Sequence, residues 1–282
     1  MQKISTKEFL PQLTEIPNPP THLYLEGSLP SDDHIYLTVV GSRRVSPYGR
    51  DAVTHLVGAL AGYPVVIVSG LALGVDGLAH RAALDAGLPT IAVPGSGLSR
   101  TILYPRTHVG LADHILSSGG GLLSEFEPDT AAAPYTFPQR NRIMAGLARA
   151  VLIIEAEELS GTLITARLAT EYNRDVLIVP GSIFSQQSKG VHQLLRLGAT
   201  PITKSDDLVE ALGLENKTAI LGTQHLPPIE AFILELLNVK PRSHEELLDK
   251  TNLSTQELSA SLTTMELKGF VTESAGMWRV QG

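Results

Sequence analysis

The feature that most constrains the fold is a series of short apolar runs, each followed by a segment of helical character. Strands that are apolar on both faces are typical of parallel sheets, which are covered by helices on both sides. The pattern therefore predicts a doubly wound, Rossmann-like α/β domain with a parallel sheet, spanning residues 35–213. The expected strands are Tyr36–Val40, Val65–Ser69, Thr90–Val93, Gly121–Ser124, Val151–Glu155, Val176–Val179 and a short run at Thr200.

Helices are expected between these strands. Ser46 followed by Pro47 is a typical N-cap and first helical residue, and predicts a helix that ends near Ala61. The other expected helices cover residues 78–87, 108–118, 141–149, 163–172 and 191–197. Before this domain, residues 1–34 are rich in proline and poorly periodic, so we expect an extended lead-in with turns.

The pattern changes near Gly213. Residues 214–228 are expected to form a linker, and residues 229–282 contain three short helical segments followed by the hairpin FVTESAGMWRV. Ser243 with Glu246, and Ser254 with Glu257, have the spacing of capping boxes. This arrangement predicts a winged helix-turn-helix domain.

The charge of this domain leaves two functions open. Residues 217–282 carry six Lys/Arg and eight Asp/Glu, a net charge of -2, and the third helix offers only Lys268, at its end. A helix that reads a DNA groove normally presents cations. The composition favours a protein-contact module over a DNA reader.

Composition limits the wider possibilities. The 282 residues carry a net charge of -7, which argues against nonspecific coating of nucleic acid, so any such site must be a local basic pocket. The absence of cysteine excludes disulfides and thiolate metal sites. Neither a secretory signal nor an apolar run long enough to span a bilayer is found, so we expect a cytoplasmic protein without membrane contact.

Small and polar residues follow the expected strands. Because ligands bind at the carboxyl ends of strands in open parallel sheets, these loops are candidate binding elements. Glycines allow backbone N–H groups to approach a phosphate, although they also serve ordinary turns. Six such loops at one edge, two of them at Ser124–Glu125 and Pro180–Gly181, favour a phosphate-bearing ligand. The candidate residues are Gly41, Ser42, Arg43, Arg44, Ser69, Gly70, Gly95, Ser96, Gly97, Ser160, Gly161 and Thr162.

The segment TFPQRNRIMAG adds an aromatic ring to these cations. Phe137 precedes Arg140, Asn141 and Arg142, and residues 130–150 contain no acidic residue. A ring that stacks on a base beside arginines that hold phosphates is typical of nucleic-acid binding. Because Pro138 disfavours a helix at Phe137, we expect the ring in the connection before the helix. The alternative is that Phe137 packs in the core.

Several chemistries lack support. There is no GxGxxG after the first strand and no GxxxxGK[ST], so neither a dinucleotide nor ATP is indicated, and we expect no cofactor. Asp76 and His80 are four residues apart on an expected helix, but one such pair is more often a structural hydrogen bond than a metal site. No serine lies in a G-x-S-x-G elbow.

Taken together, VVGSRRVSPYG, SGLALGVDGLAH, VPGSG…YP, LLSE, FPQRNRIMAGLA, EAEELSGTLITA and VPGS closely resemble the DNA-processing protein A (DprA/Smf) family. The resemblance implies a single-stranded DNA-binding protein, without catalytic activity, that protects incoming DNA and helps load RecA recombinase in natural transformation. It also implies a homodimer formed through the Rossmann-like domain. The implied DNA pocket comprises Gly41–Arg43, Ser69–Gly70, Gly95–Gly97 and Phe137–Arg142.

Three departures and one competing function accompany the resemblance. The first is that the helical N-terminal domain of the family is not expected before Leu10. SRTIL between Leu98 and Tyr104 is longer than the usual segment, and His192 stands where the family usually has Asn. The chain is also similar to nucleotide phosphoribohydrolases, which carry PGGxGTxxE. Here the corresponding LSGTLITA has Ile164 and Thr165 where acids are expected, which favours binding over hydrolysis.

Overall fold

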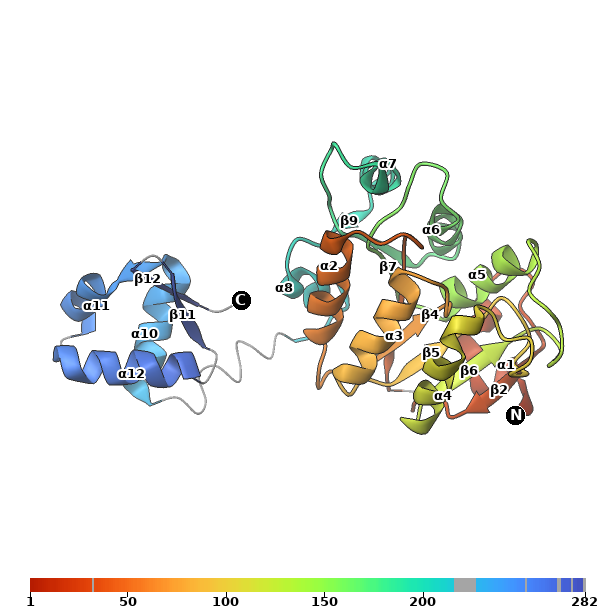
Figure 1. Cartoon of the computed structure of the whole chain (residues 1–282), viewed down its shortest axis with the longest axis horizontal. Coiled ribbons are helices and arrows are strands. Elements are labelled where there is room, and N and C mark those ends of the chain that lie inside the picture. Colours follow the sequence, from red (N-terminus) through yellow and green to blue (C-terminus); the bar gives the residue numbers. More distant parts are fainter. Residues whose placement is uncertain (32, 216–226, 252, 268–269, 275, 281–282) are drawn as a thin grey trace. The chain divides into compact units, whose positions relative to one another are not determined.

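The computed structural model describes residues 1–282 except 32, 216–226, 252, 268–269, 275 and 281–282. The chain divides into two compact units, Met1–Leu214 and Glu215–Gly282 (Figure 1). Most of the expected linker, residues 216–226, lies outside the described residues. Within the described parts, no helix has the length and apolar character needed to cross a bilayer.

The first unit is built on a nine-stranded sheet in the order β1-β2-β6-β5-β4-β3-β7-β8-β9. From β6 to β9 all neighbours pair in parallel, whereas β1 and β2 are antiparallel additions beside β6. The prediction of a doubly wound parallel sheet is therefore confirmed, with a mixed edge that the sequence pattern did not reveal. The strands are β1 Gln2–Ser5, β2 His22–Gly27, β3 Ile35–Val40, β4 Val65–Ser69, β5 Thr90–Ala92, β6 Gly121–Ser124, β7 Ala150–Ile153, β8 Asp175–Ile178 and β9 Thr200–Pro201.

Helices cover both faces of this sheet (Figure 1), because successive strand side chains point to opposite sides. Leu37 and Val39 of β3 pack with α2, α3 and α8, while Tyr36 and Val40 pack on the opposite side with α5, α6 and α7. A third cluster lies between α4 and the strands β5 and β6. The helices are α2 Pro47–Gly58, α3 Val75–Asp85, α4 Val109–Ser117, α5 Thr136–Leu147, α6 Thr162–Glu171, α7 Lys189–Arg196 and α8 Ser205–Ala211.

The expectation of an extended lead-in before residue 35 is wrong. Besides β1 and β2, this region contains the short helix α1 Thr6–Phe9 and the 3₁₀ turn η1 Pro11–Glu15. Leu10, Leu13 and Ile16 are buried in the same cluster as α5. A Cβ on Gly146 of α5 would lie 2.8 Å from Leu13, so the close approach of the two segments requires glycine there. Short elements with few apolar residues give no clear period, which is why the pattern missed them.

Of two helix starts predicted from the local sequence, one is correct and the other is wrong. The Ser46 side chain accepts a hydrogen bond from Gly49 N at 3.0 Å, so the predicted N-cap is confirmed. By contrast, α5 begins at Thr136, five residues before the predicted start at Asn141. Proline is tolerated in the first helical turn, where its missing N–H has no intrahelical partner to lose. Pro138 therefore lies inside the helix, and Phe137 with it.

The second unit has the predicted winged-helix order. It comprises α10 Pro228–Val239, β10 Arg242–Ser243, α11 His244–Thr251, α12 Thr255–Leu267, β11 Val271–Ser274 and β12 Met277–Val280. Both predicted capping boxes form: Glu246 N donates to Ser243 Oγ at 3.2 Å, and Glu257 N donates to Ser254 Oγ at 3.3 Å. Trp278 and helical leucines form its core. Lys268, the cation expected at the end of the third helix, lies outside the described residues.

Candidate functional site

A cavity of about 590 Å³ opens where the chain order of the sheet reverses. Its walls follow β3 and β7, which are neighbours in the sheet although β4, β5 and β6 lie between them in sequence. This is the topological switch point at which open α/β sheets bind ligands. Ten of the residues predicted from sequence line it, namely Gly41, Ser42, Arg43, Arg44, Phe137, Arg140, Asn141, Ser160, Gly161 and Thr162.

The inner part of the cavity contains a buried arginine and a buried aspartate. Arg140 of α5 is 5% exposed, and its Nη1 donates to Gly70 O at 2.5 Å and to Val93 O. Asp76 of α3 is also buried and accepts a hydrogen bond from Gly70 N at 3.0 Å. Burial lowers the pKa of Arg140 to about 10 and raises the pKa of Asp76, and each charge opposes the shift of the other. Arg140 is therefore cationic at neutral pH but already hydrogen-bonded by the protein.

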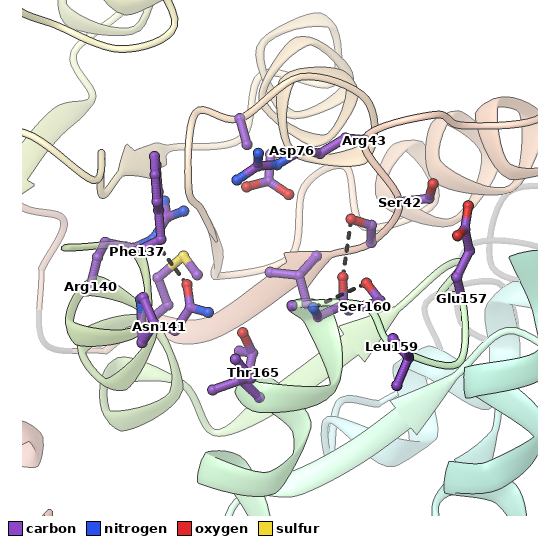
Figure 2. A pocket seen from close by; sticks show the side chains of 18 of the residues that line it. Ser42, Arg43, Asp76, Phe137, Arg140, Asn141, Glu157, Leu159, Ser160 and Thr165 are labelled. Carbon is purple, nitrogen blue, oxygen red and sulfur yellow. Dashed lines mark hydrogen bonds between the residues drawn. The ribbon is translucent and has the colours of Figure 1, made fainter. Parts of the chain in front are cut away.

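Phe137 stands one turn before Arg140 on the same helix and is half-buried. The Cζ atom of Arg43 lies 5.3 Å from the centroid of its ring, within the range of a cation–π contact. In Figure 2, Phe137, Arg140 and Asn141 lie on one side of the cavity, while Ser42 and Ser160 lie on the other. The sequence prediction that placed the ring in a loop is wrong, and the ring lines the cavity from within the helix.

The outer wall consists of two loops joined by a hydrogen bond. Thr162, at the start of α6, donates from Oγ1 to Gly41 O at 3.2 Å. In the first loop, Arg44 N donates to Ser42 Oγ at 3.0 Å, which turns the chain immediately after β3. Arg43 and Arg44 are both exposed. Their side chains are thus accessible to an anion, unlike that of Arg140.

The cavity is more mixed in charge than the local sequence indicated. The acid-free segments supply Arg43, Arg44 and Arg140, but Asp76 and Glu157 line the cavity as well. Three cations and two acids give a formal charge of +1, in a chain whose net charge is -7. The excess positive charge lies on the exposed arginines, because Asp76 lies beside Arg140 in the interior.

Five further predicted residues support the cavity from outside its lining. Gly70 must be glycine, because a Cβ there would lie 1.8 Å from Arg140 Nη1. A Cβ on Gly95 would lie 2.5 Å from the Phe137 ring, so Gly95 sets the position of that ring. Ser69 Oγ donates to Val39 O at 2.6 Å, Ser96 O accepts from Ser124 Oγ at 2.8 Å, and Gly97 N donates to Thr130 O at 2.8 Å.

Arg142 is separated from the cavity. Its guanidinium donates to Glu125 and to Asn18 O, and it does not line the pocket. Successive helical residues are rotated by about 100°, so residues two apart point in nearly opposite directions. Because α5 includes both Arg140 and Arg142, only one of the two can face the cavity.

The Asp76 and His80 side chains also have separate partners. His80 Nδ1 bonds to Thr90 Oγ1 at 2.7 Å, whereas Asp76 bonds to Gly70. Over the described ranges, no group of three or more His, Asp or Glu side chains could hold a metal ion.

Sequence reasoning missed several lining residues. Glu157, Leu159 and Ile164 come from the β7–α6 connection and from α6, and Leu159 is 98% exposed. Tyr104, outside the lining, meets Phe137 in an edge contact between the two rings, with centroids 5.8 Å apart. The YP dipeptide after the Gly95–Gly97 loop is the only sequence signal that marks Tyr104.

Comparison with known proteins agrees with this architecture. Residues 1–213 match the family model for DNA recombination-mediator protein A, and residues 221–277 match the model for the DprA winged helix domain. Protein Smf of Escherichia coli is 43% identical over 72% of this chain and 54% of its own length. DNA processing protein DprA of Bacillus subtilis is 38% identical over 76% of this chain and 71% of its own length. The chain thus spans about half of the Escherichia coli relative.

Solved structures lead to the same family. DNA processing protein A from Streptococcus pneumoniae superposes with a TM-score of 0.69 and 39% identity, over 74% of this chain and 73% of that one. The Helicobacter pylori protein, whose structure describes a single-stranded DNA binding mode, has a TM-score of 0.66 and 29% identity, over 75% of this chain and 96% of that one. On the fold, the switch-point cavity and these matches, the chain belongs to the DprA/Smf family of DNA recombination-mediator proteins.

Proposed function

We propose that the chain binds single-stranded DNA in the switch-point cavity and performs no chemistry on it. The observation that carries this proposal is the half-buried Phe137 ring beside the exposed Arg43 guanidinium. A base stacks on such a ring while a guanidinium holds the adjacent phosphate. The family relative from Helicobacter pylori binds single-stranded DNA, which supports the same ligand here.

We infer the role of each cavity residue from the exposure of its side chain. Arg43 and Arg44 hold phosphates, since their side chains are exposed and follow directly after β3. Arg140 fixes the shape of the cavity, since its Nη1 donates to Gly70 O and Val93 O. The backbone of Ser160–Thr162 at the start of α6 adds a helix N-terminus, which favours an anion.

The first test compares single- and double-stranded oligonucleotides by fluorescence anisotropy at two salt concentrations. We expect single strands to bind more tightly, with a logarithmic salt slope of about -0.7 for each phosphate contacted. Phe137→Ala should cost about 1–3 kcal/mol in binding, the usual value of one base–aromatic stack. Its effect on stability should stay below the roughly 3–5 kcal/mol of a fully buried phenylalanine.

Gly95→Ala provides a second variant that retains the ring. The new Cβ would lie 2.5 Å from Phe137, so the ring must move, and binding should weaken. Gly58→Ala on α2 is the matched control, because nothing lies within 4 Å of its added Cβ. A melting temperature many degrees lower for Phe137→Ala, with unchanged affinity at low temperature, would falsify the stacking role.

The competing function is hydrolysis of a nucleotide N-glycosidic bond. Ile164 and Thr165 line the cavity at the positions where a phosphoribohydrolase would have acids. A test for released base after incubation with nucleoside monophosphates separates the two functions. We expect no release above the rate without protein.

Two partners extend the proposal. Following the family resemblance, we infer that the bound strand is passed to RecA recombinase, which is tested by the rate of RecA filament assembly on strands preloaded with this protein. We also propose a homodimer formed through the first unit. Large apolar side chains are exposed along the segment from Ile183 to Leu197, with Phe184 at 90% and Leu197 at 84%. Patches of this kind are typical of protein interfaces.

Phe184→Glu combined with Leu197→Glu should give a monomer in sedimentation equilibrium. Single-strand affinity for long oligonucleotides should fall, because two linked pockets on one strand bind with avidity. A wild-type protein that is monomeric at micromolar concentration would contradict the dimer.

A further inference from the structure

Tyr104 presents an aromatic ring next to the cavity without lining it. Its side chain is 44% exposed, and its ring meets Phe137 in an edge contact with an interplanar angle of 61°. The two rings are therefore adjacent, but their faces point in different directions. A base stacked on Phe137 would therefore have a second aromatic ring beside it.

The exposure of Tyr104 does not come from a loose loop. Leu103 on one side is fully buried in the cluster with α4, and its N donates to Ser99 O at 3.0 Å. On the other side, His108 is buried and its Nδ1 bonds to Leu71 O at 2.8 Å. An aromatic side chain held between buried neighbours is preorganised to receive a ligand with little loss of conformational entropy.

Positive charge accompanies the ring. Arg106 is exposed, and its Nη1 donates to Arg100 O at 2.6 Å and to Thr101 O at 2.9 Å. Because both acceptors are uncharged carbonyls, these bonds do not neutralise the positive charge of Arg106. A stacking ring with a cation two residues away has the composition of a single-strand binding subsite.

We propose that Tyr104 stacks the base next to the one held by Phe137, and so forms a second nucleotide subsite outside the cavity. This inference rests on the proposed function. The planes of the two rings differ by 61°. Two neighbouring bases that stack on these rings therefore cannot remain stacked on each other, so the strand bends between the subsites. A duplex, whose bases stay stacked, cannot use both rings.

The test uses the full chain and oligothymidylates lengthened one nucleotide at a time from a dinucleotide to a hexanucleotide. For the wild type, affinity should rise as the strand reaches Tyr104. Tyr104→Ala should lose about 5- to 150-fold in affinity at that step and at longer lengths, the equivalent of one base–aromatic stack. The shortest strand that binds should keep its affinity, and Tyr104→Phe should behave as the wild type.

Phe9→Ala is the matched control, since Phe9 is also 44% exposed but belongs to α1. Thermal melts of all variants separate a loss of stability from a loss of the subsite. A loss for Tyr104→Ala that is equal at every length would overturn the proposal, because Tyr104 would then act only by positioning Phe137. Failure of every strand to bind the wild type would instead refute the proposed function.

Discussion

The inner and outer halves of the cavity use arginine in opposite ways. In the inner half, Arg140 is buried beside Asp76 and donates to two backbone carbonyls. In the outer half, Arg43 and Arg44 are exposed. The difference shows that an arginine in a binding motif can be an architectural residue, and that only its burial tells which role it has. Substitutions in the inner half should therefore change the stability of the protein, and substitutions in the outer half should change the salt dependence of single-strand binding.

The largest effect is expected from Arg140→Ala. The substitution removes charged hydrogen bonds to Gly70 O and Val93 O and leaves Asp76 buried without its neighbouring cation. The loss of unfolding free energy should be about 3–5 kcal/mol, measured by calorimetry on the full chain. Arg142→Ala is the control and should cost less, because its partner Glu125 is partly exposed. Equal losses of unfolding free energy for Arg140→Ala and Arg142→Ala would contradict the structural role assigned to Arg140.

The interior should also respond to pH through His80. Burial lowers the pKa of His80 to about 3 in the folded state, against 6.5 for the free side chain. Between these values the unfolded chain binds a proton that the folded chain does not, so stability is complete above pH 6.5 and falls as pH falls. From neutral pH to about pH 5 the loss should be about 2 kcal/mol.

His80→Asn keeps a donor toward Thr90 and removes the titrating ring. Its unfolding free energy should be flatter than that of the wild type over the same pH range. An acid loss that is identical in the variant would assign the pH dependence to other groups.

The outer half is tested by salt. Arg43→Gln and Arg44→Gln should each flatten the logarithmic salt slope of single-strand binding by about 0.7. Neither should change the melting temperature by more than a few degrees, because both side chains are exposed. Arg167→Gln on α6 is the control, since Arg167 is exposed but does not line the cavity. A slope unchanged in all three variants would place the phosphates elsewhere.

The smallest effect is expected from removing the winged helix. A chain that ends at Leu214 should keep its single-strand affinity, because every residue that lines the cavity lies in the first unit. Residues 224–282 alone, with a net charge of -2 over residues 217–282, should not shift duplex DNA at physiological salt. Duplex binding by the isolated unit would mean that its function does not follow its net charge.

The sequence predicted the part of the fold that has strong periodicity. Strands that are buried on both faces were recovered because each carries several apolar residues in a row, and the helices were placed in the segments between them. The N-terminal strands were missed because Gln2–Ser5 and His22–Gly27 contribute few buried residues and so form no continuous apolar run. The place of β2 in the sheet depends on pairing with β6, nearly a hundred residues away, and β1 in turn pairs with β2, which no local pattern contains.

The sequence predicted which residues line the cavity more accurately than how these residues are arranged. The glycine loops and Phe137 were identified because their residue types are rare in combination. The separation of Arg140 from Arg142 could not be predicted without the start of α5, since a helix sends residues two apart to opposite sides. The entry of Asp76 and Glu157 into the cavity depends on tertiary packing, so a segment free of acids did not guarantee a pocket free of acids.

The two ends of the nine-stranded sheet restrict how copies of this chain can meet. One end is the four-residue β1, and the other is β9, only two residues long and closed by Pro201, which has no N–H to donate. Edges this short expose few free backbone groups, which disfavours extension of the sheet by a strand from a second chain. The homodimer proposed above would then form through side-chain contacts, and the blunted edges would limit growth of an extended sheet.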